Sequence, residues 1–542
     1  MLRRQLENFV GTIFDVVIIG GGITGACIAR DASRRGLRVA LVERRDFSSG
    51  TSAATSKMVH GGLRYLQSMQ IGVVRESLRE RRIWERIAPH MVRPQEFIVP
   101  THSWRHDWEL RVGVRLYDLL AFDRNQLEDP AQHIPASRRI TATEAIETEP
   151  VLSGRRLFGG VVYGDCVMYS PERLALECLI DAGEHSATIA NYVEAISLTR
   201  DSAGRAVVGV RDLVSGDRFD IRARLVINAT GPWADALVRL QHEESPGRLV
   251  HSKGIHMVTR PITTTHALTV PHKGRHFFVI PWRGHSLIGT TETSYTGDPD
   301  DVAVTSDDLG VFLDFVNDAL PGARIEPSDV VFAYAGLRPL ISQPGVDSYR
   351  ASRRSEIVDH SARGGFPLLS VIGGKWTSSR ALAERCVDLV AGASGVSTRP
   401  CDTATARLPG AASGRTEPVT GTLIERYRHL PTESVVAAVE TFGSRATRVL
   451  DLAARGSVLA EPISDRRPNT LAEVLFTVRN EMALTLDDVL FRRTGIGTLG
   501  TPGRTAVERI AGVMAMEFGW SADETHQQML AASRRFRTAP SP

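Results

Sequence analysis

The first strong hydrophobic pattern in the chain is an unbroken apolar run at residues 15–20, with the sequence DVVIIG. Runs without polar interruption are typical of strands that are buried on both faces of a parallel sheet. Apolar residues then recur at helical spacing, at Ala26, Ile28, Ala29 and Ala32. A second apolar run at residues 39–42 is closed by Glu43. This order of strand, helix and strand predicts one βαβ unit near the start of the chain.

The arrangement of a strand followed by glycine returns twice, at residues 224–231 (RLVINATG) and 367–374 (PLLSVIGG). Both segments predict further strands of the same fold. Between them, residues 250–345 alternate between apolar and polar positions, as at 276–282 and 286–290. Alternation with a period of two indicates half-buried strands. We therefore predict that a second sheet domain is inserted into the first fold.

The last third of the chain has a different character. Residues 390–420 are rich in Ala, Gly, Ser, Thr and Pro, which is typical of a linker. Beyond them, apolar residues follow helical spacing in four stretches, at 433–442, 446–454, 470–482 and 505–518. These stretches predict a C-terminal helical domain.

Composition narrows the functional class. The chain has 542 residues, which is too long for one ordinary core, so two or three domains are expected. Lys and Arg number 65 against 62 Asp and Glu, and this balance argues against a nucleic-acid-binding protein. The five cysteines are scattered without a C-x-x-C pair, so we expect neither a disulfide framework nor a metal site. The first ten residues lack the apolar core of a signal peptide, which favours a cytoplasmic protein.

A glycine-rich motif, G-x-G-x-x-G, stands between the first strand and the first helix, at residues 20–25. Glu43 follows 18 residues after Gly25, at the end of the next strand. Glycines in this context let the backbone approach a pyrophosphate, the helix N-terminus offers N–H donors, and the acid accepts from ribose hydroxyls. We therefore expect Gly20, Gly22, Gly25 and Glu43 to bind a dinucleotide.

Three further segments favour FAD over a nicotinamide dinucleotide. Residues 51–57 (TSAATSK) are small and hydroxyl-rich, so they can lie against a ribityl chain and a flat ring. Two later glycine turns give additional points of close approach, and a helix that starts near Lys375 would direct its positive end at the flavin. The expected cofactor contacts in these segments are Thr51, Ser52, Ser56, Lys57, Ala229, Gly231, Gly373 and Gly374.

The chain resembles a known family over essentially its whole length. The segments that carry the resemblance are GGGITGACIARDASRRGL, TSAATSKMVHGGLRYL, INATGPWAD, KGIHMV, FVIPW with IGTTE, AGLRPL, GGKWTSSR, RLPGA, ERYRHLPTES, FGS and DDVLFRRTGIG. They are similar to those of the FAD-dependent, aerobic-type glycerol-3-phosphate dehydrogenases. The resemblance implies an α/β chain with a glutathione-reductase-like FAD-binding Rossmann domain, an inserted mixed-sheet substrate domain and a C-terminal all-helical domain.

With this fold in mind, we assign domain boundaries along the chain. The FAD-binding domain is expected in three parts, at residues 1–92, 156–248 and 351–395. Residues 93–155 would form a cap or substrate segment, 249–350 the substrate domain and 396–542 the C-terminal helical domain. The family's reaction is the oxidation of sn-glycerol 3-phosphate to dihydroxyacetone phosphate, with electrons passed to a quinone.

The residues themselves agree with a phosphorylated alcohol as substrate. A phosphate dianion requires cationic donors, and the cations in or beside the quoted segments are Arg64, Arg338, Arg353 and Lys375. For any one of them, an ordinary salt bridge is the alternative. His256 matches the family's substrate-contacting histidine, and a neutral imidazole is a suitable proton acceptor. We name His256 and Arg338 as catalytic, Tyr65 as a further substrate contact and His60 as the reserve base.

Other interpretations stay open at this point. The segments Trp376–Ser379 and Tyr169–Arg173 differ from the family's usual pattern, which bears on the identity of the substrate. An oxidase that passes electrons to O₂ and a catalytically silent flavoprotein scaffold are the two rival hypotheses. The sequence also leaves open whether the chain forms a homodimer.

Two basic amphipathic stretches, residues 73–90 and 104–122, raise the question of a membrane. Such stretches can lie on an anionic lipid surface, although a helix with a solvated charged face is the alternative. No run of 18 or more apolar residues occurs. The family resemblance implies peripheral attachment so that quinone can be reached, and we expect the inner face of the cell membrane.

Overall fold

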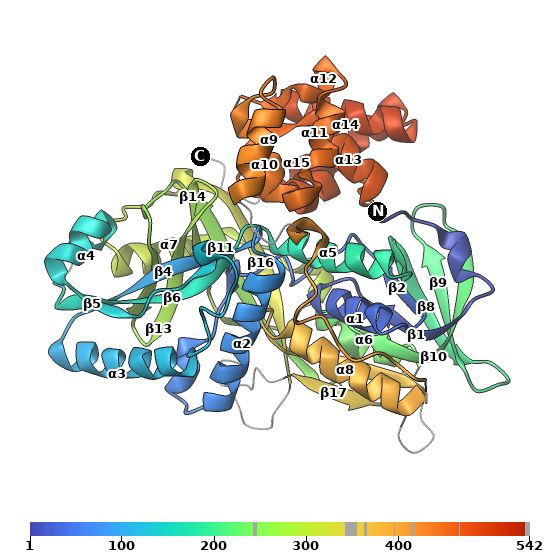
Figure 1. Ribbon diagram of the computed structural model, residues 1–542, viewed down its shortest axis with the longest axis horizontal. Helices are drawn as coiled ribbons and strands as arrows, with labels where there is room; N and C mark the ends of the chain where they lie inside the picture. Colours follow the sequence, from blue (N-terminus) through green and yellow to red (C-terminus); the bar gives the residue numbers. More distant parts are fainter. Residues whose placement is uncertain are drawn as a thin grey trace.

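A computed structural model describes residues 1–154, 156–241, 247–341, 355–361, 366–394, 396–412, 417–465 and 467–536. Figure 1 shows two sheets with their helices lying next to each other and the C-terminal helices, in orange and red, gathered at one side of both. Because Arg353 falls between described ranges, the substrate contact expected of it lies outside the described residues.

The first sheet has the order β17-β18-β10-β1-β2-β7, and β8 and β9 extend it from β10. Its strands are β1 (Ile13–Ile19), β2 (Val39–Glu43), β7 (Thr188–Asn191), β8 (Val193–Arg200), β9 (Ala206–Asp212), β10 (Arg218–Asn228), β17 (Glu356–Asp359) and β18 (Leu368–Ile372). The five strands from β18 to β7 run parallel. The apolar runs of the sequence thus form the parallel centre of this sheet.

Helices cover the first sheet because their apolar sides pack on its buried strands. Helix α1 (Ile23–Arg34) lies between α5 (Pro171–Glu184) and α8 (Ser379–Ser394). Residues of all three helices share one hydrophobic cluster with β1 and β2. Segment 396–412, which was expected to be linker, joins this cluster through Leu408.

The second sheet has the order β15-β11-β14-β13-β12-β4-β6-β3, with β16 paired to β11 and β5 paired to β6. Its strands are β3 (Met58–Val59), β4 (Val92–Thr101), β5 (Arg138–Thr141), β6 (Gly159–Met168), β11 (Leu249–Thr259), β12 (Ala267–His272), β13 (Arg275–Trp282), β14 (His285–Gly289), β15 (Thr293–Tyr295) and β16 (Val330–Ile341). The predicted α/β fold with an inserted sheet is confirmed.

The second sheet takes strands from ranges that we had assigned to the FAD-binding domain. Strand β6 pairs with β4 along ten residues, from Val92 opposite Met168 to Thr101 opposite Gly159. Strand β3 in turn pairs with β6. The predicted boundary at residue 156 therefore separates two strands of one antiparallel pair. Because β6 pairs with β4, it belongs to the second sheet, and the first sheet continues with β7.

Helices α2 (Ile71–Ile87), α3 (Trp104–Leu120), α4 (Ala142–Thr148) and α7 (Ser306–Ala319) flank the second sheet. Helix α7 packs on one face, in a cluster with Ile98, Met257 and Phe277. Residues of α2, α3 and the C-terminal helices share a different cluster with the opposite face, which contains Phe97 and Val258. The segment expected to be amphipathic at 104–122 is therefore a helix whose inner side is part of the core.

The C-terminal region is helical with one short exception. It contains α9 (Glu417–Arg426), α10 (Thr432–Phe442), α11 (Ala446–Ala453), α12 (Ser457–Ala460), α13 (Leu471–Asn480), α14 (Arg504–Phe518) and α15 (Ala522–Phe536). A capping box of Thr470 and Glu473 starts α13. The exception is a two-stranded ladder of β19 (Pro462–Ser464) and β20 (Arg467–Thr470). Within the described ranges, none of the helices is long and apolar enough to cross a membrane.

Candidate active site

One large cavity, of about 1360 Å³, lies between the two sheets. Residues of both sheets and of α3 line it, and they include the reserve base His60 and fifteen of the predicted cofactor-binding, substrate-binding and catalytic residues. The fifteen are Gly20, Gly22, Glu43, Thr51, Ser52, Ser56, Arg64, Tyr65, Ala229, Gly231, His256, Arg338, Gly373, Gly374 and Lys375. The fold therefore brings the expected cofactor and substrate residues to one continuous space.

The glycine-rich turn connects β1 to α1 at one end of this cavity. Gly20 has a φ of +110°, and a Cβ atom on it would lie 2.6 Å from the carbonyl oxygen of Ala229. Gly25 lies behind the turn, where a Cβ atom would be 1.9 Å from the carbonyl oxygen of Gly20. Gly25 thus permits α1 to approach the turn closely and leaves contact with a ligand to Gly20 and Gly22.

Glu43 stands at the carboxyl end of β2, beside the turn. Its Oε2 accepts the N–H of Gly21 at 2.7 Å, and its Oε1 accepts the N–H of Arg45 at 2.9 Å. Burial raises the pKa of Glu43, and the two backbone N–H groups oppose that shift. The carboxylate is held in a fixed orientation at the cavity wall, where it can also accept from the hydroxyls of a ribose.

The structure fits FAD along the wall that continues from this turn. The loops after β10 and β18 present Gly231, Gly373 and Gly374 to the cavity, each with a positive φ that favours glycine. The hydroxyl-rich segment after β2 lines the same wall. The backbone of the first sheet therefore approaches the cavity at three places, namely after β2, after β10 and after β18. A long, flat dinucleotide requires such close approaches. Helix α8 begins at Ser379 rather than near Lys375.

His256 lies on β11, inside the cavity wall. Its Nε2 is 2.9 Å from the Oγ of Ser56, and among the described residues its Nδ1 has no hydrogen-bond partner. Burial lowers the pKa of His256 well below its ordinary value, and the positive charges of Arg338 and Lys57 lower it further. The imidazole is therefore neutral at neutral pH and can accept a proton.

Arg338 lies on β16, next to β11. Its guanidinium donates to Thr290 Oγ1 at 3.0 Å and to the carbonyl oxygen of Thr291 at 3.4 Å. A Cβ atom on Gly254, across the strand pair, would be 2.7 Å from the guanidinium. The glycine leaves room for this side chain, and the two threonines direct it.

Lys375 comes from the loop after β18 of the first sheet, whereas Arg338 belongs to the second sheet. Its Nζ is 3.6 Å from the centre of the Tyr65 ring and 3.2 Å from the Oγ of Ser77. The close approach of the ammonium group to the ring is a cation–π contact. Arg64 lines the cavity beside Tyr65. Three cations of the predicted phosphate set thus line the cavity that contains His256.

Lys57 has a different surrounding from the one that we expected. Its Nζ donates to the carbonyl oxygen of Ala53 at 2.9 Å and to Glu172 at 2.6 Å, and the side chain is buried behind the cavity wall. Burial lowers the pKa of Lys57, and Glu172 opposes the shift. An ammonium group in this position requires a carboxylate partner, and Glu172 on α5 provides it.

The two segments that differ from the family's pattern have structural contacts. The carbonyl oxygen of Thr377 accepts from Trp84 at 3.0 Å, and its Oγ1 accepts the N–H of His60 at 3.2 Å. In the other segment, Ser170 caps α5, and Glu172 is the partner of Lys57. Both segments therefore position the cavity walls.

Sequence reasoning missed Tyr334. Its ring stacks on His256 with centroids 5.0 Å apart, and its hydroxyl donates to the carbonyl oxygen of Thr55 at 2.6 Å. A signal was present, because Tyr334 precedes Arg338 by four positions on one strand, so both side chains lie on the same face. Thr290 was missed as well, since its position depends on β14.

Comparisons with known proteins identify the family of the chain. The FAD dependent oxidoreductase family matches residues 15–388, and the C-terminal domain of alpha-glycerophosphate oxidase matches residues 401–525. A glycerol-3-phosphate dehydrogenase from Synechocystis is 34% identical over 97% of both chains. The human mitochondrial glycerol-3-phosphate dehydrogenase is 32% identical over 96% of this chain and 73% of its own length.

Solved structures show the same likeness. The glycerol-3-phosphate dehydrogenase from Bacillus halodurans, complexed with FAD, is 29% identical, has a TM-score of 0.79 and covers 99% of this chain and 97% of its own. An L-alpha-glycerophosphate oxidase from Mycoplasma pneumoniae shares the fold at 16% identity and a TM-score of 0.56, over 73% of this chain and 99% of its own. The cofactor expected from the sequence, FAD, is thereby confirmed. The chain belongs to the family of FAD-dependent glycerol-3-phosphate dehydrogenases.

Proposed function

We propose that the protein oxidises sn-glycerol 3-phosphate to dihydroxyacetone phosphate and passes the electrons to a quinone. The observation that carries this proposal is the position of a neutral, buried His256 in one cavity with Arg64, Arg338 and Lys375. A secondary alcohol needs a proton acceptor, and its phosphate needs cations. Both are available beside the wall that fits FAD.

The phosphate group is bound by the cations that line the cavity. Arg338 offers a planar guanidinium, which Thr290 and Thr291 hold in place and which can donate two parallel hydrogen bonds to phosphate oxygens. Lys375 and Arg64 line the same cavity beside Tyr65. Contacts with all three cations would orient the carbinol carbon toward the flavin wall.

The alcohol proton is taken by Nε2 of His256. This atom already shares a hydrogen bond with Ser56 at 2.9 Å, so a substrate hydroxyl can take the place of the serine hydroxyl. Bound FAD supplies the hydride acceptor of the reaction, at N5 of the flavin. Arg338 lowers the pKa of His256, and the negative phosphate counteracts this influence when substrate binds.

A quinone is supported by the apolar part of the cavity. The cavity lining also includes Leu110 and Leu116 of α3, Phe278 of β13, and Val311 and Phe315 of α7, among polar residues. Val311 is 71% exposed, so this part of the cavity opens to the surface. An apolar opening of this kind suits the ring and chain of a quinone.

The outer side of α3 supports peripheral binding to an anionic membrane. Trp104 and Trp108 on α3 are 70% and 59% exposed, and Phe122, just beyond the end of the helix, is 72% exposed. Arg105, Arg111 and Arg115 lie along the same helix. Apolar rings that project from an amphipathic helix with arginines beside them are suited to the interface of a lipid bilayer. A lipid surface on this side would bring quinone to the opening of the cavity, which favours a place on the inner face of the cell membrane.

Anaerobic stopped-flow mixing tests the proposal. Glycerol 3-phosphate should bleach the flavin of the holoenzyme, and a short-chain ubiquinone analogue should restore its colour much faster than oxygen does. A flavin that glycerol 3-phosphate leaves oxidised would overturn the substrate. A reduced flavin that oxygen reoxidises faster than the quinone, with release of peroxide, would make the protein an oxidase.

A further inference from the structure

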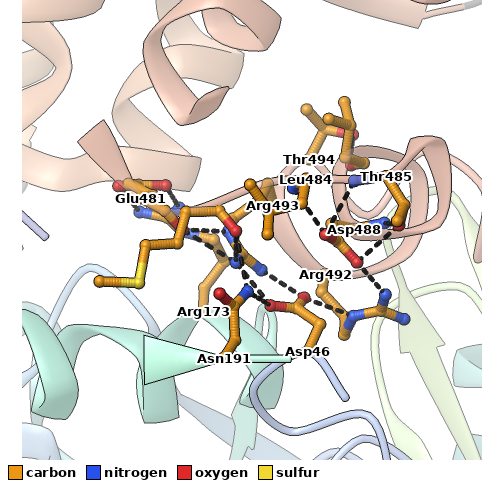
Figure 2. A network of polar contacts seen from close by, with 12 residues as sticks. Asp46, Arg173, Asn191, Glu481, Leu484, Thr485, Asp488, Arg492, Arg493 and Thr494 are labelled. Carbon is orange, nitrogen blue, oxygen red and sulfur yellow. Dashed lines mark hydrogen bonds and ion pairs between the residues drawn. The ribbon is translucent and has the colours of Figure 1, made fainter. Parts of the chain in front are cut away.

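A buried cluster of charged groups joins the C-terminal domain to the first sheet (Figure 2). Asp46 and Asn191 come from the first sheet, close to the carboxyl ends of β2 and β7. Arg492 and Arg493 come from the helical turn Asp488–Arg493 of the C-terminal domain. Asp46 follows Glu43 by three positions, so the cluster begins next to the ribose end of the cofactor wall.

The carboxylate of Asp46 is fully occupied. Its Oδ2 accepts from Nε of Arg492 at 2.6 Å and from Arg493 at 2.8 Å. Its Oδ1 accepts from Arg493 at 2.8 Å and from Asn191 at 3.0 Å. Burial alone would raise the pKa of Asp46, but Arg493 and Arg492 lower it to about 2. The carboxylate is therefore charged, and its partners are mostly residues of the other domain.

The two arginines are themselves held by the C-terminal domain. Asp488 accepts from Arg492 at 2.6 Å, and its other oxygen accepts the N–H groups of Leu484 and Thr485. Arg493 donates to the carbonyl oxygen of Glu481 at 2.9 and 3.1 Å. Figure 2 shows these contacts on both sides of Asp46. The guanidinium groups are thus fixed from their own domain and present a rigid site to Asp46.

The segment that begins at Asp46 lies against the glycine-rich turn. The Phe47 ring packs on Gly21 so closely that a Cβ atom on this glycine would lie 2.7 Å from the ring. The N–H of Ser48 donates to the carbonyl oxygen of Gly21 at 3.0 Å. The Oγ of Ser52 accepts the N–H of Ile23 at 2.9 Å. Segment 46–52 therefore contacts the turn that approaches the pyrophosphate at three points, and Asp46 begins this segment.

We propose that Arg492 and Arg493 are positioning residues of the FAD site, which act through Asp46 and segment 46–52. The C-terminal domain then sets how tightly the dinucleotide is held, although its own residues stay behind the cavity wall. This inference depends on FAD as the cofactor and is independent of the substrate and of the electron acceptor.

The chain offers a matched control for this proposal. Glu481 accepts from Arg173 of α5 at 3.1 Å and from Arg445 at 2.9 Å. This is also a buried set of ion pairs between the first-sheet region and the C-terminal domain, but it connects to α5. Glu481→Gln weakens it and keeps the backbone carbonyl that Arg493 uses. The control thus separates attachment of the domain from positioning of the segment.

The test measures release of FAD from the holoenzyme by the rise in flavin fluorescence after dilution. We expect Arg492→Gln and Asp46→Asn to release FAD at least about 10-fold faster, while Glu481→Gln lowers the melting temperature and releases FAD at the wild-type rate. Hydrogen exchange of the Arg492→Gln holoenzyme should increase in residues 46–52, and in Glu481→Gln it should stay unchanged there.

Arg492→Gln is the milder change and carries the test if Asp46→Asn does not fold. Unchanged FAD release in Arg492→Gln would overturn the proposal. Equal acceleration in Arg492→Gln and Glu481→Gln would overturn it as well, because the contacts would then only attach the domain.

Discussion

The imidazole of His256 lies nearly parallel to the phenol ring of Tyr334, with an interplanar angle of 14°. The two residues are direct partners on the antiparallel strands β11 and β16. The stack fixes the plane of the imidazole, and Ser56 holds the direction of Nε2 within that plane until the substrate hydroxyl takes its place. The proton acceptor of the proposed reaction is thus oriented by contacts from two sides.

Loss of this stack should slow flavin reduction. Aromatic pairs contribute about 0.5–1.5 kcal/mol, so Tyr334→Leu is expected to slow bleaching by about 2- to 10-fold. Tyr334→Phe keeps the ring and serves as the control for the hydroxyl contact with Thr55. The measurement is anaerobic stopped-flow bleaching with glycerol 3-phosphate. Equal rates in the Phe and Leu variants would show that stacking does not matter.

The pH dependence should report the lowered pKa of His256. Since burial and Arg338 disfavour the imidazolium, flavin reduction should be constant through the neutral range and decline only well below pH 6.5, the ordinary value for histidine, where the base becomes protonated. Arg338→Gln removes one positive neighbour, so its decline should begin at higher pH.

Both profiles are measured with unphosphorylated glycerol, because Arg338 is a proposed ligand of the substrate phosphate and its replacement would change the titration of the bound phosphate. The difference between the two profiles then isolates His256. If the pH profile of Arg338→Gln coincides with that of the wild type, the charge of Arg338 does not influence the pKa of His256. His256→Ala should slow reduction by about 10²–10⁴-fold in the neutral range, and this difference should shrink at low pH, where the wild-type base is protonated.

Arg338→Ala should distinguish phosphate recognition from chemistry. Truncation of one partner of a buried, charge-assisted contact costs about 2–5 kcal/mol. We therefore expect a loss of roughly 30- to 5,000-fold in kcat/KM for glycerol 3-phosphate and a much smaller loss for unphosphorylated glycerol. His256→Ala should slow both alcohols alike. Equal losses for both alcohols in Arg338→Ala would remove the phosphate assignment.

Gly22→Val should abolish FAD binding. A Cβ atom on Gly22 would lie 3.0 Å from Ser52 Oγ, and the valine methyl groups would occupy the wall where the pyrophosphate is expected. The purified variant should lack the yellow colour of the wild type, and absorbance at the flavin maximum measures the loss. Gly512→Val on α14, which does not line the cavity and has open space at the Cβ position, is a control for general effects of glycine replacement. Full flavin occupancy in Gly22→Val would contradict our assignment of the turn.

Membrane binding should depend on the outer side of α3. Trp104→Ser combined with Trp108→Ser should shift the protein from the pellet to the supernatant when it is sedimented with vesicles that contain anionic lipid. Val458→Ser with Met516→Ser removes exposed apolar side chains of the C-terminal domain and is the matched control. If both double variants sediment like wild type, another surface makes the contact.

Local patterns were sufficient for several parts of the structure. The apolar runs at 15–20 and 39–42 correspond to β1 and β2, and the four C-terminal helical stretches correspond to α10, α11, α13 and α14. These elements are specified by residues close in sequence, since the period of apolar positions determines the type of element. The positions of the glycine turn and Glu43 followed from the same local pattern.

Contacts between distant residues could not be predicted in this way. Strands β4 and β6 pair although many residues separate them in the sequence, so the pair has no hairpin turn that the sequence could reveal. Lys57 lies in a hydroxyl-rich segment, but its direction depends on Glu172, which is 115 positions away. Asp46 and Arg493 are separated by 447 positions. Such pairs are set by the tertiary fold, which a single sequence does not specify locally.

The separation between Asp46 and Arg493 also bears on how the protein is made. Strand β1 pairs with β10, and β10 pairs with β18, so the parallel sheet cannot close until residue 372 has been synthesised. Contacts of such high sequence separation fold slowly and leave strand edges exposed meanwhile. The support for Asp46 arrives later still, when Arg493 has left the ribosome. The nascent chain therefore completes its flavin site only late in synthesis, and we expect cofactor uptake to be a late step of its biogenesis.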